Sequence, residues 1–167
     1  MKILIFGLPG SGKTTLAQPF AKLLNGVHIN ADEVRTKYEG HNKKLWDFSE
    51  EGRLKQAQRM KYLSDGVVMS GKIAVADFVC PTKELRKVFG AQFSVYMDTI
   101  QESRFEDTNK LFERPETKGI DCDYHVAQWF DDTHLQLVPV IERFIKKQNT
   151  TPVGYWNYLL EARETDV

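Results

Sequence analysis

A glycine-rich stretch near the N-terminus has the residue types needed to hold phosphate. Residues 5–17 read IFGLPGSGKTTLA, in which Gly7, Gly12, Lys13 and Thr14 fit the pattern G-x-x-x-x-G-K-[ST] without a mismatch. Glycines let the backbone wrap closely around an anion, on which amide N–H groups converge at the start of a helix. The lysine reaches the β- and γ-phosphates of a nucleoside triphosphate, and the threonine hydroxyl binds Mg²⁺. The predicted ATP-binding residues are Gly7, Leu8, Pro9, Gly10, Ser11, Gly12, Lys13, Thr14 and Thr15.

The loop lies between an apolar run and a helical pattern, as a phosphate-binding loop requires. Residues 2–6 predict a buried strand, and residues 14–24 predict a helix closed by Asn25 and Gly26. Further strands are expected at 27–29, 72–79 and 92–98, and further helices at 32–37, from Ser49 onward and around 138–145. This alternation predicts an α/β fold, a three-layer P-loop NTPase or kinase fold with a mostly parallel central sheet.

The helix that begins after Ser49 is expected to be long, with acidic residues in its first turn. Its apolar residues recur at helical spacing and predict a buried stripe. The stripe consists of Leu54, Ala57, Met60, Leu63 and Val67.

Composition and length are those of a globular protein. The 167 residues suit one domain, 1–167, with a lid at roughly 101–128 and a C-terminal helix and tail at 131–167. Lys plus Arg (23) balances Asp plus Glu (23), which disfavours binding to nucleic acid or to an anionic membrane. Two cysteines and the lack of a signal-like or membrane-spanning apolar stretch predict a reduced, cytoplasmic protein. Whether it forms a homodimer is left open, and the four histidines show no metal-ligand spacing.

A phosphate-binding loop alone does not separate a kinase from a GTPase or a motor. The strings closest to the guanine-reading N-K-x-D, at 42–45 and 109–112, both lack the aspartate, and no D-x-x-G occurs. A motor normally needs a longer chain that senses hydrolysis. The small size therefore favours a small-molecule kinase, which is an ATP-dependent phosphotransferase. A nucleotide-binding regulatory module without transfer activity is the alternative from another class.

Asp77 ends the apolar run IAVAD, where an aspartate can hold Mg²⁺ through its waters. The alternative is a buried, hydrogen-bonded aspartate without a metal role, because a lone buried charge needs a partner. The predicted metal-binding residues are therefore Thr14 and Asp77.

Three short stretches follow the loop in order: NADEVR (30–35), WDFSEEGR (46–53) and VADFVCPTKELR (75–86). Together with the loop they resemble the D-G-D-N-V-R, F-S-x-x-D-R and S-F-I-S-P boxes of the adenylylsulfate kinase family, over roughly residues 1–125. The resemblance implies a Mg-ATP-dependent kinase that phosphorylates the 3′-hydroxyl of adenylylsulfate in sulfate assimilation. A related nucleoside, nucleotide or polynucleotide 5′-hydroxyl kinase is the alternative.

The resemblance also implies which side chains face the acceptor. Asp32 matches the second aspartate of the first box, beside the acceptor hydroxyl, and with Lys13 it makes the predicted catalytic pair. Its alternative role is to cap the helix that follows. Arg35 is implied to bind the acceptor's anionic part, or else to be a solvated helix residue. Phe48 and Arg53 match the box that cradles the acceptor adenine, and an equal alternative places Phe48 in the core.

Several positions depart from the family pattern. Asn30 and Gly52 replace aspartates of the first two boxes, and Asp77 replaces a small residue. Residues 118–121 read KGID, a shortened form of the family's K-G-F-T-G-I-D, and Lys118 is assigned to acceptor binding. In the family, the phenylalanine of this string closes over the acceptor base. Its absence here bears on which acceptor is bound and not on the phosphoryl donor.

The polar segment 101–128 shows little periodicity and predicts a mobile lid. A kinase needs such a lid because water in the site would hydrolyse ATP. The cations Arg104, Lys110 and Arg114 are expected either to supply positive charge to the transferring phosphoryl group or to be solvated surface charges.

Overall fold

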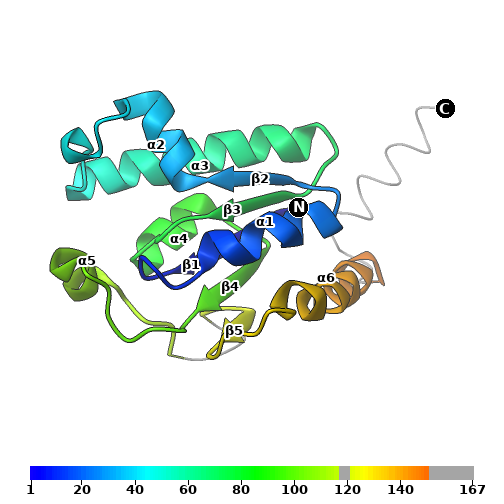
Figure 1. Cartoon of the computed structure of the whole chain (residues 1–167). Coiled ribbons are helices and arrows are strands. Elements are labelled where there is room, and N and C mark those ends of the chain that lie inside the picture. The colour runs from blue at the N-terminus through cyan, green and yellow to red at the C-terminus, as the bar shows by residue number, and fades with distance from the viewer. Residues whose placement is uncertain (117–120, 151–167) are drawn as a thin grey trace. The chain divides into compact units, whose positions relative to one another are not determined.

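The computed structural model describes residues 1–116 and 121–150 of the chain (Figure 1). The chain divides into two compact units, residues 1–131 and 132–167, which are described separately. That both belong to one domain stays a prediction, and the predicted tail at 151–167 lies outside the described residues. Each helix in the described ranges is too short or too polar to cross a bilayer.

The first unit is built on a five-stranded sheet in the order β2-β3-β1-β4-β5 (Figure 1). The strands are β1 (Lys2–Gly7), β2 (Val27–Asn30), β3 (Ala74–Asp77), β4 (Phe93–Met97) and β5 (Tyr124–Val126). All of their pairings are parallel, so the carboxyl ends of the strands meet at one edge. The predicted α/β fold with a parallel sheet is confirmed. The mobility of the lid stays a prediction.

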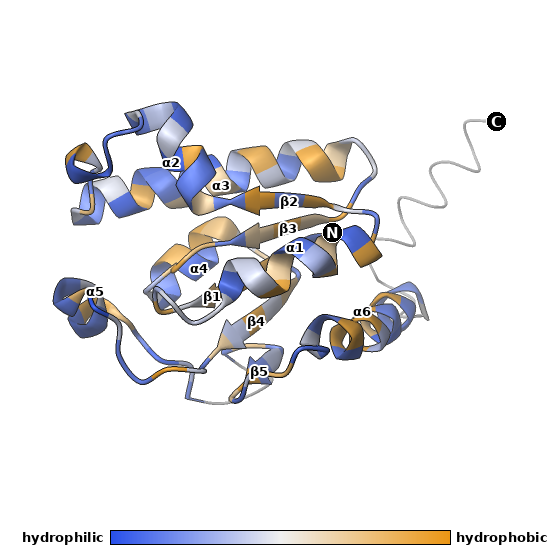
Figure 2. Cartoon of the chain, viewed as in Figure 1, coloured by the Kyte–Doolittle hydropathy of each residue, from blue (hydrophilic) through white to orange (hydrophobic). Residues whose placement is uncertain are grey.

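Helices connect the strands of the first unit. They are α1 (Lys13–Leu23), α2 (Ala31–Glu39), the 3₁₀ helix η1 (Lys43–Leu45), α3 (Glu50–Met69), α4 (Lys83–Phe89) and α5 (Glu106–Leu111). Figure 2 shows hydrophobic residues along β2 and β3, whereas α2 and α5 are largely hydrophilic. The second unit contains α6 (Thr133–Thr150), the long last helix that the apolar residues between 138 and 145 predicted.

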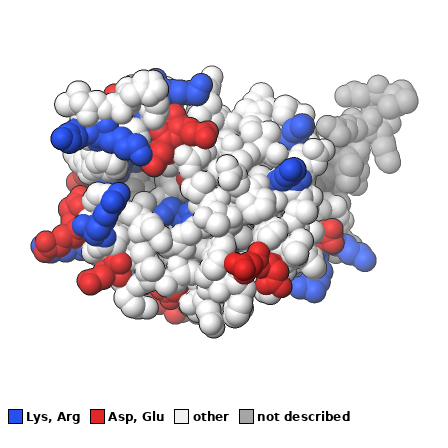
Figure 3. All heavy atoms as spheres, viewed as in Figure 1, with Lys and Arg blue, Asp and Glu red and all other residues white. Residues whose placement is uncertain are grey.

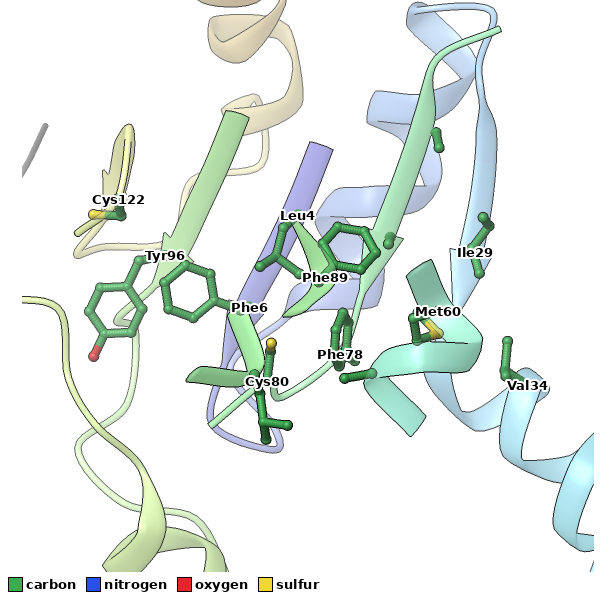
Figure 4. Close-up of a cluster of buried hydrophobic side chains, with 14 of the residues drawn as sticks. Leu4, Phe6, Ile29, Val34, Met60, Phe78, Cys80, Phe89, Tyr96 and Cys122 are labelled. Carbon is green, nitrogen blue, oxygen red and sulfur yellow. The ribbon is translucent and has the colours of Figure 1, made fainter. Parts of the chain in front are cut away.

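The main hydrophobic core lies between one face of the sheet and the helices α3 and α4. Leu4 and Phe6 of β1 meet Met60 of α3 and Phe89 of α4 there (Figure 4). Side chains alternate along a strand, so the equally buried Ile3 and Ile5 point to the opposite face.

Helix α1 contacts β1, β2 and β3 and buries Leu16, Ala17 and Phe20, which lie outside that core cluster. It starts directly after the phosphate-binding loop and runs back over the sheet. Its position therefore fixes the loop at the carboxyl edge of the sheet.

Helix α3 begins as predicted, because the Ser49 hydroxyl accepts a hydrogen bond from the Gly52 amide at 3.1 Å. Ala57 and Met60 are fully buried. The prediction that Leu54 is buried was wrong, since it is 37% exposed while its neighbour Arg53 points inward. The first turns of α3 line a pocket rather than the packed core, and the polar side chains of Arg53 and Gln56 are accommodated there.

Gly52 is required by the tight approach of α3 to the preceding loop. A methyl group at this position would lie 2.4 Å from the backbone carbonyl oxygen of Asp47. We predict that Gly52→Ala destabilises the protein by roughly 1–3 kcal/mol in chemical denaturation, because the loop must shift. In the same helix, Gly66 has no atom within 4 Å of the corresponding position. Gly66→Ala should therefore stabilise by about 0.5–1 kcal/mol. Equal effects of the two substitutions would contradict this packing.

Candidate active site

The loop between β1 and α1 has the geometry of an anion cradle. Gly12 has a φ of 92°, a left-handed conformation that favours glycine, and no side chain caps the start of α1. A methyl group on Gly7 would lie 2.6 Å from the Met97 carbonyl oxygen, so β4 passes too closely for any larger residue. The buried Ser11 hydroxyl has no hydrogen-bond partner among the described residues. The backbone N–H groups at the start of α1 thus have no side-chain partner, which fits the binding of a phosphate group.

Lys13 lies inside this loop and is only 9% exposed. Its Nζ donates a hydrogen bond to the Leu8 carbonyl at 2.9 Å, a contact that a phosphate oxygen can replace. Burial lowers the pKa of Lys13 to about 8, although the nearby carboxylates of Asp77 and Asp32 act in the opposite direction. The contact with Leu8 holds the ammonium group at the loop, where the phosphates would bind.

The Thr14 hydroxyl and the Asp77 carboxylate meet at the carboxyl edge of the sheet. Thr14 Oγ1 donates to Asp77 Oδ1 at 3.1 Å, and Asp77 is 2% exposed. Asn30 Nδ2 lies 3.1 Å from Thr14 Oγ1 and 3.3 Å from Asp77 Oδ1. The imidazole Nε2 of His28 pairs with Asp77 Oδ2. This edge therefore holds a hydroxyl and a carboxylate with every oxygen of the carboxylate hydrogen-bonded.

These groups suit Mg²⁺ better than they suit a metal ion that is held by protein ligands alone. In residues 1–116 and 121–150, no three His, Cys, Asp or Glu side chains lie close enough to hold a metal ion. Mg²⁺ is commonly bound by one or two protein oxygens together with water and substrate phosphates. Thr14 and Asp77 can supply that protein share. The observed hydrogen bonds are equally those of a structural aspartate, so the metal role of Asp77 stays a prediction.

His28 and Asn30 are members of this cluster that the sequence did not reveal. Both lie on β2 two residues apart, so their side chains share one face of the sheet. β2 pairs with β3 in a register that places Asn30 opposite Asp77. The available signal was the alternation of two polar residues in the strand, which becomes informative only when the strand order is known.

A pocket of about 80 Å³ lies beside this edge, between α2, α3 and the segment after β3. It brings together Asp32, Arg35, Phe48 and Arg53, all of which the family resemblance assigned to the acceptor. The other lining residues are Ala31, Gln56, Phe78, Val79, Cys80, Pro81 and Leu85. Their roles stay predictions, and Lys118 lies outside the described residues.

Phe48 lies close to two guanidinium groups at this pocket. The Arg35 guanidinium carbon is 4.4 Å and that of Arg53 5.5 Å from the centre of the ring. The ring is 47% exposed, so the alternative that placed Phe48 in the core is wrong. A half-exposed aromatic ring close to two cations suits a planar base that carries an anionic group.

Both arginines are buried and anchored. Arg35 is 5% exposed, and its Nη1 donates to Glu39 at 2.7 Å and to the Asp47 carbonyl at 2.9 Å. Arg53 Nη2 donates to the Thr108 hydroxyl at 3.1 Å. Burial lowers the pKa of both guanidinium groups, but their partners favour the charged form. The alternative that Arg35 is a solvated helix residue is therefore wrong.

Asp32 lies at the rim of the pocket with its side chain 67% exposed. Its nearest cation is Lys43, at 3.6 Å and equally exposed, which is a weak surface pair. The cap of α2 is Asn30, whose side chain accepts from the Glu33 amide at 3.1 Å. The alternative that Asp32 caps this helix is wrong, and its carboxylate is available to a ligand.

The three lid cations in the described residues have local partners. Arg114 Nη1 donates to Asp98 at 3.1 Å and to the Tyr96 hydroxyl at 3.0 Å, at the end of β4. Lys110 pairs with Glu106 at 3.0 Å, and the Arg104 guanidinium carbon lies 4.9 Å from the centre of the Phe105 ring. Figure 3 shows charges of both signs gathered at the end of the molecule where α2 and α5 lie. The proposed action of these cations on the phosphoryl group stays a prediction.

The parallel sheet order, the phosphate-binding loop and the neighbouring pocket together define a P-loop kinase. The family model for adenylylsulphate kinase matches residues 1–128, so the chain belongs to the adenylylsulfate kinase family. No curated protein matches the sequence.

Solved structures of several kinases share the fold. An adenylylsulfate (APS) kinase of Mycobacterium tuberculosis, in complex with AMPPNP and APS, is 16% identical, with a TM-score of 0.68 over 84% of this chain and 96% of its own. A shikimate kinase of Aquifex aeolicus is 18% identical, with a TM-score of 0.60 over 87% and 98%. A gluconokinase of Sinorhizobium meliloti is 15% identical, with a TM-score of 0.57 over 87% and 94%. Kinases named for different acceptors share this fold, so the fold does not identify the acceptor.

The lowered pKa of Lys13 gives a testable pH dependence. Above pH 8 the free protein releases this proton, whereas the negative charge of a bound triphosphate favours the protonated form. We predict that Mg-ATP binding takes up a proton at pH 9 but not at pH 7, and that affinity falls above pH 8. Calorimetry in two buffers of different ionisation heat measures this uptake.

Lys13→Arg is the control for this experiment, because arginine stays charged at both pH values. Any binding that remains in this variant should occur without proton uptake. The same uptake in the variant as in the wild type would show that another group titrates.

Proposed function

We propose that this protein is a Mg-ATP-dependent kinase that phosphorylates a hydroxyl group of a nucleotide-like acceptor, with adenylylsulfate as the first candidate. The observation that carries the proposal is the pocket lined by Asp32, Arg35, Phe48 and Arg53, whose other walls include the residues that follow β3 at the carboxyl edge of the sheet. Asp32 is near enough to Lys13 to act on its pKa. A carboxylate at the acceptor pocket thus lies close to the lysine that would hold the transferred phosphate.

The donor half of the reaction would depend on the loop. The backbone N–H groups at the start of α1 and the Lys13 ammonium would bind the phosphates. The Thr14 hydroxyl, together with Asp77, would hold the cation. When bound, Mg²⁺ would offset the negative charge that builds up on the phosphate oxygens during transfer.

The acceptor half would depend on the pocket. The Phe48 ring offers a face for a base, and the anchored guanidinium groups offer positive charge for a sulfate or phosphate. Cys80 also lines the pocket, but burial raises the pKa of its thiol far above neutrality, so it takes no part as a nucleophile. The preferred acceptor is therefore planar at one end and anionic at the other.

Asp32 would orient the acceptor hydroxyl and accept its proton. A bond forms between this hydroxyl oxygen and the γ-phosphorus, the bond from the γ-phosphorus to the β–γ bridging oxygen breaks, and ADP leaves. The proton moves to the Asp32 carboxylate late in the transfer. Because the carboxylate is exposed and held only by a weak surface pair, it is free to make this contact.

Release of ADP from Mg-ATP in the presence of different acceptors tests the proposal. Adenylylsulfate should stimulate release most strongly among a panel of nucleosides, nucleotides and 5′-hydroxyl oligonucleotides. If another member of the panel stimulates release and adenylylsulfate does not, the protein is a related kinase with that acceptor. Binding of ATP with no stimulation by any acceptor would favour a regulatory module.

The role of Asp32 predicts a variant that separates binding from transfer. Asp32→Asn should lower acceptor-stimulated turnover roughly 10²- to 10⁴-fold and leave the affinity for Mg-ATP within about twofold, because the amide cannot accept the proton. Glu33→Gln is a matched control, since Glu33 is also exposed in the first turn of α2 but does not line the pocket. Unchanged turnover in Asp32→Asn would remove this residue from the reaction.

A further inference from the structure

We infer that His28 is a positioning residue of the proposed cation site, where it orients the Asp77 carboxylate toward the Thr14 hydroxyl. This inference rests on the proposed function, because it concerns the residues that would hold Mg²⁺ with ATP. His28 lies in the middle of β2, and nothing in the phosphate-binding loop pattern or in the three family boxes includes it.

The hydrogen bonds divide the two oxygens of Asp77 between different partners. Oδ2 pairs with Nε2 of His28, and Oδ1 accepts from the Thr14 hydroxyl at 3.1 Å. Asn30 Nδ2 lies within 3.3 Å of Oδ1 and 3.4 Å of Oδ2, so it bridges both without distinguishing them. His28 is therefore the partner that holds the second oxygen and fixes the plane of the carboxylate, with the first oxygen at the Thr14 hydroxyl.

This pairing defines which ring nitrogen of His28 acts as the hydrogen-bond donor. A carboxylate only accepts hydrogen bonds, so the Nε2 atom that faces Asp77 must carry a hydrogen. The His28 side chain is 16% exposed and that of Asp77 is 3% exposed, so water competes little for the contact. A buried carboxylate that loses such a donor is both less stable and freer to rotate, since its terminal torsion is soft.

The consequence for a cation concerns Thr14. Its hydroxyl gives its hydrogen to Asp77 and accepts one bond from Asn30 at 3.1 Å, which leaves one lone pair of the oxygen unused. That lone pair can bind Mg²⁺ only while Asp77 Oδ1 keeps the hydroxyl hydrogen turned away. His28 thus acts on the cation through Asp77 and then Thr14, without touching it.

Binding of ATP with and without Mg²⁺, measured by calorimetry, tests this role directly. His28→Leu removes the donor, and it should leave the affinity for ATP without Mg²⁺ within about twofold. The gain in affinity on adding Mg²⁺ should fall roughly 10- to 100-fold, the usual effect of losing a residue that orients a metal ligand. A leucine that only loosened the fold would weaken both affinities together.

Two further variants complete the test. His28→Gln keeps an N–H donor of similar reach and should recover most of the Mg²⁺ effect, to within about threefold of wild type. His41→Leu, at an exposed position after α2, should match the wild type. Thermal unfolding reports whether each variant is folded, and if His28→Leu is not, His28→Asn takes its place because its side chain is too short to reach Asp77.

A wild-type response to Mg²⁺ in His28→Leu or His28→Asn would overturn the inference, as would failure of His28→Gln to recover it. These measurements involve no acceptor. If no acceptor were phosphorylated, the proposed kinase activity would fail while the role of His28 could still be confirmed.

Discussion

Helix α1 begins with backbone N–H groups that no side chain caps, and the rest of the site is arranged around them. Helices α2, α3 and α4 each begin with a side chain that accepts from the backbone, namely Asn30, Ser49 and Thr82. Uncapped amides at a helix start carry partial positive charge and bind anions. The loop before α1 keeps them open because Gly12 adopts a left-handed conformation and Gly7 lets β4 pass closely. A bound phosphate group would accept hydrogen bonds from these backbone N–H groups, which have no partner side chain in the protein.

The parallel sheet brings the remaining chemistry to the same edge. Because β1 pairs with β3 and β3 with β2, three strand ends converge where α1 starts. Asp77 and Asn30 meet across two of these ends, beside Thr14. The buried carboxylate of Asp77 is stable at this edge because each of its oxygens has hydrogen-bond donors. The pocket lined by Asp32, Arg35, Phe48 and Arg53 begins directly after the same strands, so an acceptor bound there, as we propose, would meet the donor without any long-range rearrangement of the sheet.

Much of the fold could be predicted because strand and helix patterns are local. The phosphate-binding loop, the strands before and after it and the cap of α3 at Ser49 all depend on short runs of sequence. The buried face of α3 could not be predicted from apolar spacing alone, since Arg53 and Gln56 point inward to a pocket while Leu54 is exposed. Strand β5 was also missed, because its three residues, Tyr124–Val126, alternate within a polar segment.

The residues of the candidate site also divide into those that a local sequence pattern predicts and those that depend on the order of the strands. The loop residues follow from one motif, and the acceptor residues from a resemblance. His28 and Asn30 emerged only from the strand order, which places β2 beside β3 although α2 and α3 separate them in the chain. A contact between residues 49 positions apart, as between His28 and Asp77, has no local signature in the sequence.

The most direct test of this account is a crystal structure of the protein with Mg²⁺ and a non-hydrolysable ATP analogue. We expect the β- and γ-phosphates to lie against residues 7–15, with Lys13 Nζ moved from the Leu8 carbonyl to a phosphate oxygen and the cation beside Thr14. An analogue bound elsewhere, with the loop unchanged and the Lys13–Leu8 contact intact, would contradict the account.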